Sequence, residues 1–223
     1  MNSREDPHVE SRPDGRRKKQ AFREFEAKTG VIVRNVCEPC CSSAEDRAAI
    51  ERQLGFLPTN VFSVASRAES GEPTVLKLYP LAVSLKGARA GNGDRQPFPT
   101  MYWLSCPSLK AAVSQLENQG LVGDWEKRLQ EDPRVLAEMK AAHKSYAEER
   151  WAMLTSADLD FVRQREWEAS LGSSVGVAGI SRPTTIKCLH THFAHFLATG
   201  ENIVGKWVQD ALKAGLHLSR VVR

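Results

Sequence analysis

The sequence lacks three features that would place it in a specialised class of protein. No apolar run among its 223 residues reaches the about 18 residues that suggest a membrane-spanning helix. The N-terminus has no apolar segment typical of a signal peptide, and Glu5, Asp6 and Glu10 argue against a transit peptide. Five cysteines, an odd number, do not fit a secreted disulfide framework. These absences predict a cytoplasmic protein without a membrane span.

Signatures of nucleic-acid binding are also missing. The net charge is only +4, and much of the basic character comes from the run Arg16 to Lys19 and from Arg12 nearby. Such a run is either a solvated flank or a nuclear-localisation patch, so a nuclear location stays open as an alternative. Neither zinc-finger spacing nor an aromatic-interleaved basic surface follows it, and nucleic acid is therefore not an expected partner.

Composition predicts one globular domain. With 41% apolar and 26% charged residues, the chain can bury a substantial core. We expect a leader at 1–43 that makes no stable contact with the core, a domain at 44–215 and a tail at 216–223. The leader contains Cys37, Cys40 and Cys41. Since a second CxxC is absent, these cysteines fit half of a shared zinc site, a redox pair or reduced thiols.

Periodicity predicts an α+β fold, in which a small antiparallel meander of about three strands is packed by several helices and the C-terminal half is helical. Strands are expected near 61–67, 74–81 and 100–105. The glycine-rich stretch 84–96 lacks the Lys-Ser/Thr ending of a phosphate-binding loop, so it is expected to be a connector. Helices are expected near 44–54, 107–119, 122–131, 133–154, 156–170, 184–199 and 203–214.

The run from Lys187 to His195 has the highest density of potential metal-binding or reactive side chains, because it holds a cysteine and three of the six histidines. On the expected helix 184–199, Cys188, His192 and His195 share one face, and His190 sits at the edge of the apolar face. Imidazole and thiolate are ligands for zinc or another transition metal. The spacing matches no common zinc motif, so an ordinary polar helix face stays open.

The residues at the two ends of that helix predict where it begins and stops. Ser181 is the expected N-cap, Pro183 lies in the first turn, and Gly200 ends the helix.

Cys106 lies between an aromatic-rich strand and a helix that Pro107 opens. A thiolate at or beside an N-cap is favoured by the helix dipole. Cys106 is therefore a candidate metal ligand or nucleophile, although a small buried residue is the equally plain interpretation. We predict that Cys106, Cys188 and at least one of the three histidines converge.

The long helix that begins at Asp132-Pro133 carries polar groups within its apolar stripe. His143, Tyr146 and Arg150 share the face that points to the core. They either tie this helix to a neighbour through hydrogen bonds or line a pocket, where Arg150 binds a small anion and His143 or Tyr146 moves a proton. In the first case Glu117, Asp124 and Glu126 are candidate partners of Arg150.

Three segments together carry a resemblance to a known family. PFPTMYWLSCP at 97–107, HxxYxxxR at 143–150 and KCLHTHFAH at 187–195, in this order, resemble domain-of-unknown-function family 501, a mostly bacterial group. The likeness runs from about Ile50 to Val208. It implies a compact domain with Cys106, Cys188, His190 and His195 at the family's characteristic positions, and it brings no established activity.

Two stretches depart from the family pattern. The family commonly has an Arg-Cys pair before a Gly-x-Pro turn, and here Arg67 is followed by Ala68. If that cysteine is a metal ligand elsewhere, His192 is the candidate replacement. The segment from about Thr155 to Ser170 is longer than the family pattern implies and is expected to be an added helix that Thr155 and Asp158 cap.

Three functions remain open from the sequence. The first is a zinc-type metal protein that uses Cys106, Cys188 and the histidines. The second is a thiol- or metal-dependent hydrolase that uses the same residues, with Arg67 and Arg150 as anion clamps. The third is a noncatalytic interaction module, which the resemblance links weakly to cell division.

Overall fold

Three antiparallel strands form the centre of the computed structural model, which describes residues 43–83 and 95–215. Strands β1 (Val61–Arg67), β2 (Pro73–Leu78) and β5 (Tyr102–Leu104) pair in the order β1-β2-β5. Strands β3 (Leu81–Val83) and β4 (Arg95–Pro97) form a second antiparallel pair. The expected small antiparallel sheet is confirmed. The predicted leader with its cysteine cluster and basic run, most of the glycine-rich stretch and the predicted tail lie outside the described residues.

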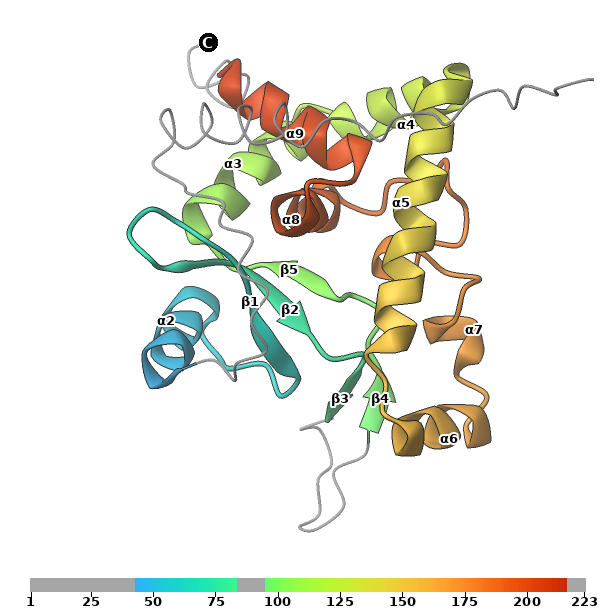
Figure 1. The fold of residues 1–223 in the computed structure, drawn as a ribbon. Helices are drawn as coiled ribbons and strands as arrows, with labels where there is room; N and C mark the ends of the chain where they lie inside the picture. Colours follow the sequence, from blue (N-terminus) through green and yellow to red (C-terminus); the bar gives the residue numbers. More distant parts are fainter. Residues whose placement is uncertain (1–42, 84–94, 216–223) are drawn as a thin grey trace, which may run out of the picture.

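Helices cover both faces of the three-stranded sheet (Figure 1). Helix α2 (Ala44–Leu54) packs on one face, where its Ile50 joins Leu76 and Leu78 of β2. Helix α8 (Leu189–Thr199) packs on the other face, where Phe193 shares the main core with Val75. Since side chains alternate along a strand, β2 supplies both cores.

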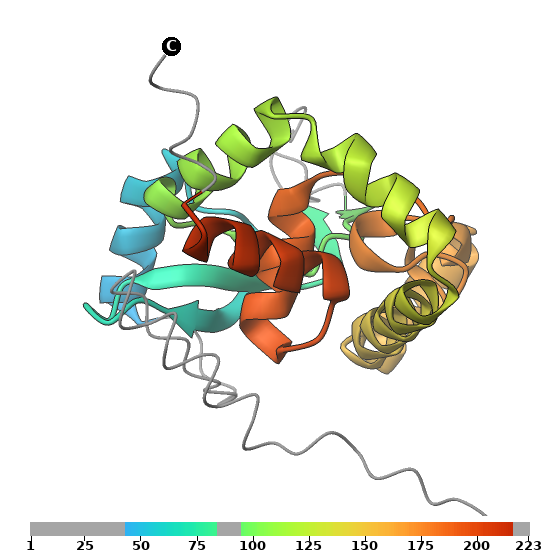
Figure 2. The ribbon, with the colours of Figure 1, turned by 90° about the horizontal axis from the view of Figure 1, so that it is seen from above.

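The rest of the C-terminal half is helical. Helix α9 packs on α8, while α3 and α5 both contact α9, and α4 follows α3 around the edge (Figures 1 and 2). The fold is therefore α+β with a helical C-terminal half, as predicted. The bounds are α3 Pro107–Asn118, α4 Leu121–Glu131, α5 Pro133–Ala152, α6 Ser156–Gln164, α7 Glu168–Leu171, η1 Val177–Gly179 and α9 Ile203–Lys213. Within the described residues, no helix is long and apolar enough to cross a membrane.

Several predicted helix ends are confirmed by their capping contacts. The Asp132 carboxylate accepts the N–H of Arg134 at 2.9 Å at the start of α5. The Thr155 hydroxyl accepts the N–H of Asp158 at 3.2 Å at the start of α6. Gly200 ends α8 in the left-handed conformation, with φ 75°, a conformation that glycine adopts without steric cost.

Two predicted helices were wrong in extent. The helix expected at 184–199 begins only at Leu189, because Cys188 is extended with φ −162° and ψ 153°. The N-terminal cap proposed at Ser181 is therefore incorrect. The helix expected at 156–170 is interrupted, because Glu166 has a positive φ of 55° between the end of α6 and the start of α7.

Candidate functional site

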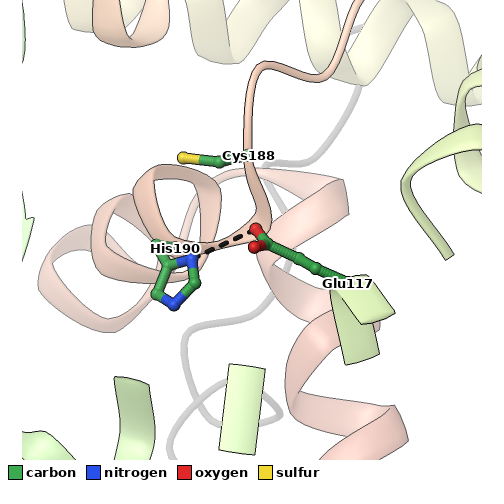
Figure 3. Close-up of side chains that lie close together, drawn as sticks. All are labelled: Glu117, Cys188 and His190. Atoms are coloured by element: carbon green, nitrogen blue, oxygen red, sulfur yellow. Dashed lines mark hydrogen bonds and ion pairs between the residues drawn. The ribbon is translucent and has the colours of Figure 1, made fainter. Parts of the chain in front are cut away.

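One glutamate, one cysteine and one histidine meet where the end of α3 approaches the start of α8 (Figure 3). Among the described residues, Glu117, Cys188 and His190 form a group of possible metal ligands whose donor atoms all lie within 4.8 Å of one another. Glu117 comes from the last turn of α3, Cys188 is the N-cap of α8, and His190 lies in the first turn of α8. All three residues are half-buried.

Glu117 explains why α8 begins where it does. The first N–H groups of a helix have no partner within the helix. The Glu117 carboxylate accepts the N–H of Leu189 at 2.6 Å, and a negative charge there is also favoured by the helix dipole. Just before the helix, Glu126 accepts the N–H of Ile186 at 2.7 Å. The two acidic residues therefore hold the backbone at positions 186 and 189, on either side of the extended Cys188.

Both ring nitrogens of His190 face acceptors. Nδ1 lies 3.1 Å from Glu117 Oε1, and Nε2 lies 3.1 Å from the Lys110 carbonyl oxygen. The hydroxyl of Ser114 lies 3.3 Å from Nε2. Lys110, Ser114 and Glu117 lie on one face of α3, spaced by four and three residues. This face of α3 fixes the orientation of the imidazole.

The electrostatics of the group favour charged partners. The pKa of His190 is raised, first by its interaction with Cys188 and then, against the effect of burial, by the Glu117 carboxylate and the Lys110 carbonyl. Burial raises the pKa of the Cys188 thiol, but hydrogen bonds from His190 and Thr191 outweigh it and hold that pKa below its ordinary value. The Thr191 hydroxyl lies 3.3 Å from Cys188 Sγ.

The predicted grouping of Cys188 with His192 and His195 was wrong. It assumed that residue 188 is helical, whereas Cys188 is an extended N-cap, so the face that helical geometry assigns to it does not exist. His190, which the sequence set apart, is the histidine that joins Cys188. Glu117, considered only as a partner for Arg150, was missed as a member of the group.

Cys106 lies at the N-cap of α3, as predicted, and is half-buried. Its sulfur lies 3.2 Å from the Ser108 hydroxyl. Within the part of the chain that the structure describes, Cys106 is not a member of the ligand group at Glu117. Of the predicted set, Cys188 and His190 meet in this group, and Cys106 makes a local contact with Ser108 outside it.

His192 and His195 belong to a separate, buried cluster held by Asn202. Asn202 Oδ1 accepts the N–H of Gly205 at 3.0 Å, which orients the side-chain amide so that its NH₂ group donates to His195 Nδ1 at 3.2 Å. The His195 ring therefore carries its proton on Nε2. His192 Nδ1 lies 3.1 Å from the amide nitrogen and 3.3 Å from the amide oxygen of Asn202. Burial, with smaller repulsion from neighbouring histidines, lowers the pKa of each of the two histidines to about 3.

His143 and Tyr146 point to the core, as predicted, where they face α8. The His143 ring lies 6.3 Å from that of His192, and the Tyr146 ring lies 5.0 Å from that of His195. His143 Nδ1 accepts the N–H of Val177 at 3.0 Å, and burial lowers the pKa of His143 to about 4. The Tyr146 hydroxyl accepts the backbone N–H groups of β5 and the residue before it, Tyr102 and Met101. Burial raises the Tyr146 pKa to about 12, which makes this hydroxyl a poor proton carrier.

Arg150 is fully buried and surrounded by backbone carbonyls. Its Nε donates to Leu171, Nη1 to Pro99 and Gly176, and Nη2 to Gly172 and Val175. These five bonds use all five N–H groups of the guanidinium. A ring of carbonyl oxygens also repels anions. Arg150 is therefore a structural cross-link between α5 and the 171–176 segment, with backbone carbonyls in place of the acidic partners Glu117, Asp124 and Glu126 that the sequence suggested.

Arg67 is paired as well. Its Nη1 and Nη2 donate to the two Asp46 oxygens at 2.6 and 2.7 Å. This bidentate ion pair joins β1 to α2. The hydrogen bonds from the Arg67 guanidinium lower the pKa of Asp46. Arg67, like Arg150, is therefore occupied by partners within the protein.

The fold and the group define a small α+β domain that brings glutamate, cysteine and histidine together at a helix start. Residues 64–210 match the model of the family described as protein of unknown function (DUF501). The match covers more than half of the chain, and the chain belongs to this family. No curated protein and no solved structure matches it.

Proposed function

We propose that this protein binds a zinc-type transition-metal ion through Glu117, Cys188 and His190. The observation that carries the proposal is the approach of their three donor atoms to within 4.8 Å of one another. Ligands of a tetrahedral zinc ion lie about 2.0 to 2.3 Å from the metal, which separates them from one another by roughly 3 to 4 Å. A small rotation of half-buried side chains brings the three donors to that spacing.

The surroundings of His190 also support a metal. A histidine that binds a metal through one nitrogen usually donates its other N–H to a carbonyl or carboxylate. His190 Nε2 lies 3.1 Å from the Lys110 carbonyl oxygen, while Nδ1 faces Glu117. A metal ion at Nδ1 replaces a proton there and leaves the Lys110 contact intact.

The charges and the number of ligands fit a zinc-type ion. A thiolate and a carboxylate balance the charge of a divalent ion, and thiolate with imidazole is a donor set that zinc accepts. Three protein ligands leave a fourth position for water. An ion held by Glu117 on α3 and by Cys188 and His190 at the start of α8 would fasten the two helices together, which favours a structural role over a metal- or thiol-dependent hydrolase.

Elemental analysis of the purified full chain and titration with Zn²⁺ and Co²⁺ test the proposal. Because Cys37, Cys40 and Cys41 are also possible ligands, the titration is repeated on a chain that has serine at these three positions. We expect this chain to keep one equivalent of metal, and its Co²⁺ form to show a thiolate-to-metal absorption band.

Single substitutions then locate the ion. Cys188→Ala and His190→Ala are expected to remove the band and the tight equivalent, and Cys106→Ala is the matched control that keeps both. The proposal fails if Cys188→Ala still binds one equivalent with the same absorption band, or if Cys106→Ala loses it equally.

A further inference from the structure

Five backbone carbonyl groups surround Arg150 and form what we call its carbonyl cage. The N–H of each of these peptide units points in the opposite direction to its carbonyl group. Four of the five accepting carbonyls belong to Leu171, Gly172, Val175 and Gly176. The described chain has no cis peptide bond, and in a trans peptide the N–H points opposite to the C=O. Each of these four peptide groups therefore directs an N–H away from the guanidinium.

Three of these four N–H groups have partners. The N–H of Gly172 donates to the Glu168 carbonyl at 2.7 Å and that of Gly176 donates to the Ile180 carbonyl at 2.7 Å. The N–H of Val177 donates to His143 at 3.0 Å. The fourth N–H, that of Ser173, has no protein partner within the described residues, and Ser173 is exposed. A fixed N–H is thus presented at the surface.

Ser173 lines a groove between α5 and the 168–183 segment. One part of the groove has a volume of about 240 Å³ and is lined by Lys140, Lys144, Ser173, Ser174 and Ser181, among others. A second part has a volume of about 580 Å³ and includes Trp151, Ala152 and Ala169. The two parts share Ser173, Ser174, Ala147 and Glu148.

The charges in the smaller part favour an anion. Lys140 and Lys144 outnumber Glu148 there. Glu148 lies 3.7 Å from Lys144 in an exposed pair, and such pairs are weak enough for a stronger acceptor to replace. Lysines, serine hydroxyls and a fixed backbone N–H are the donors that phosphate oxygens accept.

We propose that this groove binds a phosphate-type oxyanion next to Ser173, carried by a ligand whose apolar part lies along Trp151 and Ala169. Arg150 acts here without touching the ligand, because its cage fixes the direction of the Ser173 N–H. The site is independent of the proposed metal at Glu117, since the two share no residue.

Inorganic phosphate and phenyl phosphate are the probes, titrated calorimetrically into the metal-free full chain at constant ionic strength. We expect saturable binding of both, with phenyl phosphate the tighter because its ring meets the apolar wall. Lys140→Gln/Lys144→Gln is expected to weaken binding by about tenfold or more, since it removes two charged donors. Lys127→Gln/Arg134→Gln removes the same charge from exposed positions elsewhere and is expected to leave binding unchanged.

A second pair of variants tests the N–H itself. Ser173→Pro removes the N–H while Ser173→Ala keeps it, and the extended Gly172, with φ −78° and ψ −168°, suits a following proline. We expect a larger loss of affinity for Ser173→Pro than for Ser173→Ala. Cys188→Ala is expected to bind phosphate normally, which separates this site from the metal. Absence of saturable binding, or equal binding by Lys140→Gln/Lys144→Gln and its control, overturns the proposal.

Discussion

The Glu117 carboxylate lies 3.1 Å from Nδ1 of His190 and, through the same oxygen, accepts the N–H of Leu189 at 2.6 Å. One side chain of α3 thus orients the ring of His190 and caps the helix that carries it. Each of the two side chains in this pair is 25% exposed, so water screens only part of their attraction. The pair therefore affects the position and charge of His190.

Glu117→Gln is expected to lower the pKa of His190 in the metal-free protein, because a neutral amide attracts the imidazolium less than a carboxylate does. A raised pKa contributes stability that is fully present below the unfolded value, near 6.5, and is lost as the pH rises through the folded pKa. NMR titration of the His190 ring measures the change. Glu126→Gln, which changes the nearby acceptor of the Ile186 N–H but no contact with His190, is the control, and an unchanged His190 pKa in Glu117→Gln would contradict the prediction.

The buried histidines predict acid sensitivity. The pKa of His143 is about 4 and those of His192 and His195 are about 3, so the folded state stays neutral where the unfolded state binds protons. Stability is then complete above about pH 6.5 and falls as the pH decreases toward the folded values. Each histidine contributes a slope of up to about 1.4 kcal/mol per pH unit.

Chemical unfolding at several pH values between 5 and 6 measures that slope. His143→Gln is expected to reduce the slope of stability against pH by up to about 1.4 kcal/mol per pH unit, whatever the effect of the substitution on stability at neutral pH. An identical slope in His143→Gln and the wild type would show that His143 is protonated in the folded state.

Arg150→Ala is expected to destabilise the protein by about 3 to 5 kcal/mol, because carbonyl oxygens that Arg150 now satisfies lose their donors. Arg150→Lys is expected to recover little of this loss, since an ammonium cannot supply five coplanar donors. Urea unfolding measures both. Arg47→Ala, at an exposed arginine of α2, is the control and should change stability by less than about 0.5 kcal/mol.

Gly176→Ala is expected to destabilise the protein, because the added Cβ would lie 2.1 Å from Nδ1 of the buried His143. Overpacking of this kind costs about 1 to 3 kcal/mol or more. Gly123→Ala is the matched control, since its Cβ meets nothing within 4 Å in the first turn of α4. There alanine should stabilise the helix by up to about 0.5 kcal/mol. Thermal unfolding is expected to move in opposite directions for the two variants.

Asn202→Asp is expected to change the tautomer of His195. The asparagine amide donates to His195 Nδ1, whereas a carboxylate only accepts. The His195 ring should then carry its proton on Nδ1. Long-range ¹⁵N–¹H NMR spectra of the histidines distinguish the two forms, and unchanged spectra would contradict the assignment.

The sequence predicted most local structure because its signals act over a few residues. Thr155 and Asp158, or Asp132 with Pro133, are close enough along the chain to form their caps whatever the rest of the molecule does. The failures lie where a distant residue decides. The start of α8 was misplaced because Glu117, seventy-two residues before Leu189, satisfies the N–H that a local cap would have satisfied.

By itself the sequence determined the α+β fold, the membership of Cys188 and His190 in a chemically distinctive run, and the burial of Arg150 within an apolar stripe. Only the tertiary structure decided which partners these residues meet. Cys188 and His190 meet Glu117, and Arg150 meets five carbonyls. The reason is physical: periodicity fixes the face on which a side chain lies, but its partner is set by packing between elements that are far apart in the chain.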